Sequence, residues 1–293
     1  SFLTIQEGCD KFCKFCVVPY TRGPEFSRSI KELVKEANQL AKNGAREINL
    51  LGQNVNAFNY ENNKLSDLIY EISKIRNIKR IRYTTSHPKD FTKDLIEAHK
   101  NCEKLMPLVH LPVQSGSNKI LKAMNRKHTV EEYLEIVQSL IKIKPNIKFS
   151  SDFIIGYPGE DNQDFKDTID LIKKVNFINS YSFIFSPRPG TVAENLEIIN
   201  KEISTERLKI IQKLLSENQI KNNKSLENQT INVLAENFTK DKTKIFGRSE
   251  HMTPVFFEGK GEKIGKIVAV KIRQSNRNTL FGELTTILNK KVA

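Results

Sequence analysis

The sequence predicts an α/β fold in its first part and a small antiparallel β-barrel at its end. Strand-like and helix-like stretches alternate from the N-terminus, and a polar loop separates each strand from the helix that follows. Strand–helix units in series favour parallel strands joined by right-handed crossovers, hence an α/β barrel or a doubly wound sheet. Beyond residue 226 the pattern changes to short strands separated by polar turns, which is typical of a small barrel.

The first part is predicted to contain six strands, and in a barrel the chemistry would lie on the loops that follow them. Two of its helices open with capping-box signatures, Ser29-x-x-Glu32 and Thr129-x-x-Glu132, in which side chains bond free backbone N–H groups. A long helix at about 205–221 closes this part. The six strands are expected at Phe2–Gln6, Glu47–Leu51, Ile78–Thr84, Leu108–Val113, Ile147–Ile155 and Ser180–Phe185.

The C-terminal barrel is predicted to be basic and to carry aromatic side chains. Residues after 226 include twelve Lys and Arg against seven Asp and Glu, and Phe246, Phe256, Phe257 and Phe281 lie among its strands. A basic small barrel with aromatics is typical of proteins that bind single-stranded or loop nucleic acid. For most of these phenylalanines, however, we expect a place in the barrel core. The five strands are expected at Thr230–Ala235, Lys244–Arg248, Pro254–Phe257, Lys266–Ile272 and Thr279–Thr286.

The charge of the chain favours a polyanionic partner. Its 47 Lys and Arg against 34 Asp and Glu give a formal net charge of +13, which favours nucleic acid, although lysines that only solvate the surface are the alternative.

No run of about eighteen apolar residues and no signal peptide is found, so we expect no membrane association and a cytoplasmic location. Because the chain begins at Ser1 and enters a strand at once, we expect a fragment of a longer protein.

Three of the four cysteines fall within eight positions, as Cys9-x3-Cys13-x2-Cys16, on the loop after the first strand. Three thiolates on one loop can bind three irons of a [4Fe–4S] cluster and leave the fourth iron open. The amino and carboxylate groups of S-adenosylmethionine suit that open iron, and one electron given to the sulfonium yields a 5′-deoxyadenosyl radical. A zinc site is the alternative, but zinc prefers four closed ligands and Cys102 is the only other cysteine.

The cysteine segment resembles the radical-SAM superfamily, whose hallmark is this spacing with an aromatic residue before the last cysteine, here Phe15. The longer string from Thr4 to Gly23 is similar to the methylthiotransferases of that superfamily. The end of the chain, with Gly247-Arg-Ser and Leu280-Phe-Gly-Glu283, resembles the TRAM domain. Further matches are Leu50-Leu-Gly-Gln-Asn-Val-Asn56, Thr84-Thr-Ser-His-Pro88, His110-Leu-Pro-Val-Gln-Ser-Gly116, Met124-Asn-Arg126, Asp152-Phe-Ile-Ile-Gly-Tyr-Pro-Gly-Glu160 and Ser186-Pro-Arg-Pro-Gly-Thr191.

The resemblance implies a partial (β/α)6 TIM-like barrel at 1–225 and an RNA-binding TRAM barrel at 226–293. It implies addition of a methylthio group to carbon 2 of N6-isopentenyladenosine beside the anticodon, with the tRNA anticodon stem-loop and an electron donor such as flavodoxin as partners. Family members that modify threonylcarbamoyladenosine or a ribosomal-protein aspartate are the nearest alternatives, and the run Val17-Val-Pro-Tyr-Thr21 favours the first branch. An RNA-binding protein with a structural metal is the alternative from another class.

The resemblance also implies a second [4Fe–4S] cluster, held by three more cysteines in an N-terminal domain, which we expect only in the full-length protein. It implies that Phe15 shields the cluster or packs on the adenine. Each polar or glycine position also has a purely structural interpretation, as a turn or an ion pair, and no catalytic acid or base is assigned. The expected cluster ligands are Cys9, Cys13 and Cys16, and the expected contacts of S-adenosylmethionine are Gln53 and Asn54 at its amino group, Gln114 and Ser115 at its ribose or carboxylate, Arg126 at its carboxylate (or an RNA phosphate), and Gly156, Pro158 and Gly159 at its adenine.

Overall fold

The structure of the chain is a computed structural model that describes residues 1–285. The chain divides into two compact units between Leu215 and Ser216. This division falls inside helix α8 (Lys201–Ser225), whereas the sequence places the domain limit where that helix ends. The limit at 225/226 therefore stays a prediction. The last predicted strand extends to Thr286, which lies outside the described residues.

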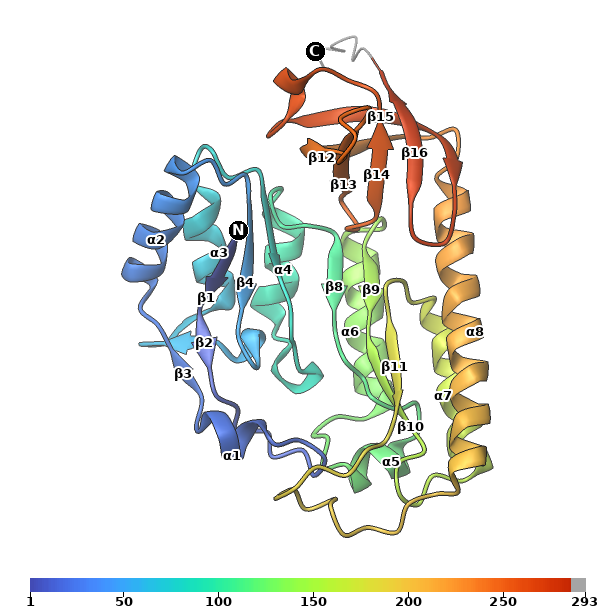
Figure 1. Cartoon of the computed structure of the whole chain (residues 1–293). Coiled ribbons are helices and arrows are strands. Elements are labelled where there is room, and N and C mark those ends of the chain that lie inside the picture. Colours follow the sequence, from blue (N-terminus) through green and yellow to red (C-terminus); the bar gives the residue numbers. More distant parts are fainter. Residues whose placement is uncertain (286–293) are drawn as a thin grey trace. The chain divides into compact units, whose positions relative to one another are not determined.

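The first unit is built on a series of seven strands that run parallel to their neighbours, as the crossovers require. A parallel bridge between Ile81 and Leu105 and another between Gln114 and Phe153 link the separate strand pairs into one series. Because the spatial order follows the chain order, the strands form one arc, and the predicted partial barrel is confirmed (Figure 1). The strands are β1 (Phe2–Thr4), β4 (Glu47–Leu51), β7 (Arg80–Tyr83), β8 (Leu108–His110), β9 (Lys148–Ser150), β10 (Asp152–Ile155) and β11 (Tyr181–Ile184).

The helices of this unit bury apolar side chains against the strands, except α1, which has no buried residue. The capping box at Thr129 and Glu132 is confirmed, whereas at Ser29 the hydroxyl alone accepts the N–H of Glu32, at 3.3 Å. One continuous core of apolar side chains, such as Leu33 and Ile48, joins helices and strands. The helices are α1 (Val18–Arg22), α2 (Ile30–Lys42), α3 (Leu65–Ser73), α4 (Lys93–Asn101), α5 (Asn118–Ala123), α6 (Val130–Ile143), α7 (Asn162–Val175) and the start of α8.

All six predicted strands are present; Glu47–Leu51 has its predicted bounds, and the other five are shorter than predicted or interrupted. The predicted strand 108–113 stops at His110, since the N–H of Val113 donates to the Ser151 hydroxyl rather than to a neighbouring strand. The predicted strand 147–155 is interrupted at Ser151, between β9 and β10. Short elements that sequence patterns did not predict fill the loops: β2 (Gln6–Glu7), β3 (Phe26–Ser27), β5 (Asn59–Tyr60), β6 (Asn63–Lys64), and the 3₁₀ turns η1 (Val55–Ala57), η2 (Pro88–Asp90) and η3 (Gly261–Lys263).

The second unit contains a closed five-stranded barrel in the order β12-β13-β14-β16-β15. Four of its pairings are antiparallel, and the pairing of β14 with β16 is parallel. A parallel pair is unavoidable, because an odd number of strands cannot alternate in direction all the way around a closed barrel. The strands are β12 (Thr230–Phe238), β13 (Ile245–Ser249), β14 (Pro254–Phe257), β15 (Ile267–Ser275) and β16 (Leu280–Leu284).

The expectation that most phenylalanines of this barrel form its core is wrong. Only Phe257 belongs to the buried core, whereas Phe246, Phe256 and Phe281 are half-buried outside it. The physical reason is the two-residue period of a strand: Phe256 and Phe257 are neighbours, so they face opposite sides of the sheet.

Gly247 occupies an inward position of the barrel where a side chain has no room, and this generates a stability prediction. A Cβ on Gly247 would lie 2.4 Å from the carbonyl oxygen of Leu234. We expect Gly247→Ala to destabilise this unit by about 2 kcal/mol through overpacking, measured by urea denaturation. Gly261→Ala is the control. A Cβ there would meet only a side chain, that of Phe238 at 3.3 Å, and no backbone atom so closely. Equal unfolding midpoints for the two variants would contradict the prediction.

Candidate functional site

The three clustered cysteines lie on one loop, which runs between β2 and β3. These two short strands pair antiparallel and so bring the ends of the loop together. Within the loop, the N–H of Cys9 donates to the carbonyl of Gly23 at 3.2 Å, and the N–H of Cys16 donates to the carbonyl of Cys13 at 2.9 Å. Cys13 is buried, and Cys9 and Cys16 are half-buried. The loop thus presents three free thiols from one compact turn.

Two glutamine side chains hold the start of this cysteine loop. The N–H of Gly8 donates to Oε1 of Gln53 at 2.8 Å, and the carbonyl of Gly8 accepts from Nε2 of Gln6 at 2.8 Å. Gly8 has a φ of +73°, and a Cβ there would lie 1.9 Å from the carbonyl oxygen of Pro24. Gln53 therefore has a structural contact of its own, and its predicted contact with S-adenosylmethionine stays a prediction.

A network of charged side chains also holds the cysteine loop in place. The sequence patterns did not reveal this network. Nζ of Lys11 lies 2.9 Å from Asp90 and 3.8 Å from Glu25. The amide of Asn54 donates to both carboxylates, at 2.7 Å and 3.1 Å respectively. Burial opposes the charge of Lys11, but the hydrogen bond and the charge of Asp90 outweigh it and raise the pKa of the lysine. These residues are far apart in sequence, so no motif could have grouped them.

Arg126, a predicted site residue far from the cysteines in sequence, lies beside one of them in the structure. Its Nη1 lies 3.6 Å from Sγ of Cys13, and its Nη2 donates to the carbonyl of Pro112 at 2.6 Å. Its Nε–H is buried and has no hydrogen-bond partner among the described residues. The guanidinium therefore places positive charge beside a thiol while keeping one donor free.

The surroundings of the thiols favour the protonated form unless a cation binds. Burial, and then the charges of Glu25, Cys13 and Cys16, raise the pKa of Cys9 to about 11 despite an opposing backbone hydrogen bond. Burial and the charge of Cys13 likewise raise the pKa of Cys16. A metal centre supplies the positive charge that thiolates need. Among residues 1–285 no group of three or more His, Cys, Asp or Glu side chains is arranged to hold a metal ion. A [4Fe–4S] cluster does not need three side chains grouped around a single metal ion, since each thiolate binds its own iron.

Six of the eleven buried side-chain polar atoms that have no partner within residues 1–285 belong to five residues around the cysteine loop. Each unpartnered buried group costs roughly 1–3 kcal/mol, so such a concentration indicates a polar ligand. The rings of His87 and His128 are 5.5 Å apart, and burial and the charge of Arg126 lower the pKa of both, that of His128 to about 3. Within the described residues these atoms are Asn54 Oδ1, Ser86 Oγ, His87 Nε2, Arg126 Nε, and both ring nitrogens of His128.

His87 has a defined tautomer and is not among the site residues expected from the sequence. Its Nδ1 accepts the N–H of Lys89 at 3.1 Å. In a neutral ring the proton must then lie on Nε2, which is the buried atom without a partner. The sequence signal that pointed to this residue was its position before a proline at a strand end.

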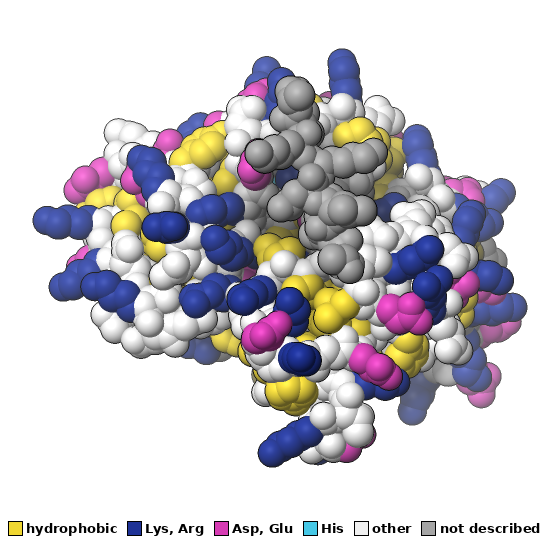
Figure 2. All heavy atoms as spheres, turned by 90° about the horizontal axis from the view of Figure 1, so that it is seen from above, with side chains coloured by type: hydrophobic (Ala, Val, Ile, Leu, Met, Phe, Trp, Pro, Cys, Tyr) yellow, Lys and Arg dark blue, Asp and Glu magenta, His cyan; other side chains and the backbone are white. Residues whose placement is uncertain are grey.

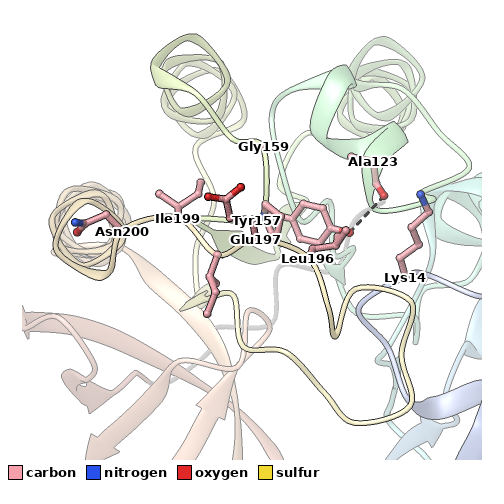
Figure 3. Close-up of a pocket in the computed structure, with 10 residues that line it drawn as sticks. Lys14, Ala123, Tyr157, Gly159, Leu196, Glu197, Ile199 and Asn200 are labelled. Carbon is pink, nitrogen blue, oxygen red and sulfur yellow. Dashed lines mark hydrogen bonds between the residues drawn. The ribbon is translucent and has the colours of Figure 1, made fainter.

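The glycine-rich loop after β10 adjoins a pocket of about 610 Å³ beside the cysteine loop. Gly156 has a φ of +70° and packs against Ser204, where a Cβ would lie 2.4 Å from the hydroxyl. Figure 3 shows the Tyr157 ring in this pocket, with its hydroxyl donating to the carbonyl of Ala123 at 3.3 Å. The pocket is lined by Lys14, Ala123, Tyr157, Pro158, Gly159 and the segment 196–200. The structure thus brings Pro158 and Gly159 together with the cysteine loop.

The remaining residues that the sequence predicts to contact S-adenosylmethionine are Phe15, Gln114 and Ser115. Phe15 packs on an apolar cluster that includes Tyr157 and Phe185, and its predicted role beside the iron–sulfur cluster or the adenine stays a prediction. The backbone of Gln114 is in the left-handed conformation, with a φ of +76°, where this residue forms a bridge to Phe153 of β10. Ser115 is buried, and its hydroxyl lies 3.4 Å from that of Thr168 on α7, so its predicted contact with the cofactor stays a prediction.

Three curated proteins similar to this chain carry the same name. A tRNA-2-methylthio-N(6)-dimethylallyladenosine synthase of Pelagibacter ubique is 63% identical over 297 residues, which cover 100% of this chain and 67% of that protein. Synthases of the same name from Wolbachia pipientis wMel and Rickettsia akari are 53% and 49% identical and cover 96% and 97% of this chain. The chain spans about two thirds of the length of these relatives.

Solved structures agree on the fold. Coproporphyrinogen III oxidase of Escherichia coli, described as a radical SAM enzyme, aligns over 97% of this chain and 71% of its own, with a TM-score of 0.56 and 13% identity. A radical S-adenosylmethionine methyltransferase of Kitasatospora setae, with cobalamin and a [4Fe-4S] cluster bound, covers 66% of this chain and 38% of its own, with a TM-score of 0.56 and 16% identity.

Two protein-family models match this chain, one in each of its two parts. The radical SAM superfamily matches residues 3–172, which include the cysteine loop and the strands up to β10. The TRAM domain matches residues 224–285, which include the closed barrel. The chain therefore belongs to the radical SAM superfamily and, within it, to the family of the tRNA-2-methylthio-N(6)-dimethylallyladenosine synthases.

Proposed function

We propose that this chain is the catalytic part of a tRNA methylthiotransferase, which adds a methylthio group to carbon 2 of N6-isopentenyladenosine next to the anticodon. The observation that carries the proposal is the match to the Pelagibacter synthase at 63% identity over the whole chain. Because the chain spans about two thirds of its relatives, the complete reaction is proposed for a polypeptide of their length.

We assign Cys9, Cys13 and Cys16 as ligands of three irons of a [4Fe–4S] cluster. Membership of the radical SAM superfamily implies such a cluster together with S-adenosylmethionine. When bound, the cluster supplies the electron that cleaves the sulfonium and generates a 5′-deoxyadenosyl radical. The chain itself holds the cysteine loop in place, partly excludes water from the thiols, and sets the Arg126 cation beside Cys13.

The buried polar atoms without hydrogen-bond partners around the cysteine loop are suited to bind S-adenosylmethionine. Asn54 Oδ1 is an acceptor for its amino group, and Arg126 Nε–H is a donor for its carboxylate. Pro158 and Gly159 line the adjoining pocket, where the glycine lets backbone approach an adenine closely. In this assignment Gln53 supports the loop, and Gln114 and Ser115 remain candidates for the ribose or carboxylate.

The partners that we propose are a tRNA anticodon stem-loop and an electron donor such as flavodoxin, met in the cytoplasm. The TRAM match and the net charge of +13 support the RNA. Figure 2 shows Lys and Arg side chains spread over one face of the molecule, with Asp and Glu between them. No helix of residues 1–285 is both long and apolar enough to cross a membrane.

The alternative substrates receive no support from the relatives named above. Those relatives all carry the dimethylallyladenosine name, rather than a threonylcarbamoyladenosine or ribosomal-protein activity. Nucleoside mass spectrometry of tRNA from cells lacking the gene tests the substrate directly. Loss of the 2-methylthio derivative of isopentenyladenosine is expected, whereas loss of a threonylcarbamoyladenosine derivative would replace the proposal.

The first prediction concerns the thiols. Because all three hold the cluster, Cys9→Ala, Cys13→Ala or Cys16→Ala should each abolish formation of 5′-deoxyadenosine and lower the content of iron and acid-labile sulfide. Cys102→Ala is the control, since Cys102 is buried at the end of α4, within the apolar core. Cluster loss in the Cys102 variant with retention in the Cys13 variant would refute the assignment.

The second prediction concerns the clamp on the loop. Lys11→Met leaves the carboxylates of Asp90 and Glu25 without their cation and frees the loop beside Cys9. We expect 5′-deoxyadenosine formation to slow by roughly ten- to a hundredfold, because the reacting groups are misplaced. The matched control is Lys89→Met, which removes an exposed lysine from the same neighbourhood. Equal rates for both variants would show that the clamp does not position the loop.

The third prediction concerns sulfur. A second [4Fe–4S] cluster, proposed to supply or hold the inserted sulfur, needs three cysteine ligands, and these 293 residues contain one cysteine beyond the first three. We expect the chain, reconstituted and reduced without oxygen, to form 5′-deoxyadenosine but no 2-methylthio product on isopentenylated tRNA. Mass spectrometry quantifies both products in one assay. Product at one equivalent or more per chain would show that no second cluster is needed.

A further inference from the structure

Three phenylalanines form a continuous row on the outer face of the C-terminal barrel. Phe246 on β13 pairs directly with Phe256 on β14, which pairs in turn with Phe281 on β16. The ring centroids are 5.5 Å apart in the first pair and 6.0 Å apart in the second, and the second pair is close to parallel, at 24°. We call these three residues the aromatic row.

The row lies on the side of the sheet that faces away from the barrel core. Its strand neighbours Gly247 and Phe257 point inward and are buried, whereas the three rings of the row are only half-buried. Cross-strand aromatic pairs stabilise a sheet, but the solvated face of such a sheet is normally polar. A row of half-buried aromatic rings on this face departs from that rule and makes the face a candidate binding surface.

Positive charge accompanies the row at both ends. Nζ of Lys244 lies 5.9 Å from the centre of the Phe281 ring, and Cζ of Arg248 lies 5.1 Å from the centre of the Phe246 ring. The turn that leads into β13 also exposes Lys240 and Lys242. The acidic residue of that turn, Asp241, is engaged by hydrogen bonds from the hydroxyls of Thr239 and Thr243. Arg248 itself pairs with Glu236, so the cations next to the row that can meet an anionic partner are Lys240, Lys242 and Lys244.

We propose that the aromatic row stacks with unpaired bases of RNA, while the lysines of the preceding turn contact the adjoining phosphates. Aromatic side chains beside a basic groove bind single strands in this way, because every base has a π-face and every linkage a charge. The charge complementarity favours RNA over a second copy of this basic chain. The proposal deepens the proposed function by naming the surface and the part of the RNA, an unpaired loop rather than a stem.

The test uses the full chain with two labelled RNAs, a hairpin with an unpaired loop and the blunt duplex of its stem. Phe256→Leu should weaken binding of the hairpin about tenfold, since one stacked base is lost. The affinity for the duplex and the slope of affinity against salt should stay unchanged, because no charge is removed. Phe256→Tyr keeps a ring and should retain wild-type affinity. Lys242→Gln should instead weaken both RNAs and flatten the salt slope.

Several results would overturn this proposal. If Phe256→Leu binds the hairpin like the wild type, or weakens hairpin and duplex equally, the row only stabilises the sheet. If the variant turns a dimer into a monomer in sedimentation, the row is an interface between copies. Circular dichroism checks that the variant is folded. Formation of 5′-deoxyadenosine, measured without RNA, separates this proposal from the catalytic one, because it should be unchanged in Phe256→Leu.

Discussion

The geometry of the site depends on one fully buried amide, that of Gln6. Its Nε2 donates to the carbonyls of Glu7 and Gly8, at 2.9 Å and 2.8 Å, and its Oε1 accepts the N–H of Asn54 at 2.9 Å. One side chain thereby fixes the start of the cysteine loop to the loop after β4, and a Cβ on Gly52 would lie 2.6 Å from its oxygen. The donors and the acceptor of this amide are all used, so any displacement of either loop leaves a buried polar group unsatisfied.

Around this fixed point the site combines groups that are satisfied with groups that are not. The Lys11 clamp and the Gln6 amide are fully engaged and position the thiols. Arg126, which lies next to Cys13, and His128, by contrast, keep buried nitrogen atoms without partners among the described residues. Rigid supports beside unsatisfied groups are what a preorganised binding site requires, because the ligand then completes the hydrogen bonding without moving the chain.

The sequence predicted the strands, the capping box at Thr129 and the cysteine loop because each depends on local patterns. It did not reveal the contact of Lys11 with Asp90, because residues 79 positions apart (90 − 11) meet only through the order of the strands. It also assigned the barrel phenylalanines to the core, because a count of aromatics carries no information on which face of a strand each one takes. That information lies in the register of Phe246 with Phe256. Gln53 shows the same limit, since its amide proved to bind the chain itself.

The central claim is that three thiols of one loop hold a cluster whose open iron receives S-adenosylmethionine. Electron–nuclear double resonance tests it most directly, on the reconstituted and reduced chain with S-adenosylmethionine labelled with ¹⁵N in its amino group and ¹⁷O in its carboxylate. The account predicts hyperfine coupling of both labels to the cluster spin, and loss of that spin signal in Cys13→Ala. A reconstituted chain that shows a cluster signal without coupling to either label, or that holds one zinc and no sulfide, would contradict it.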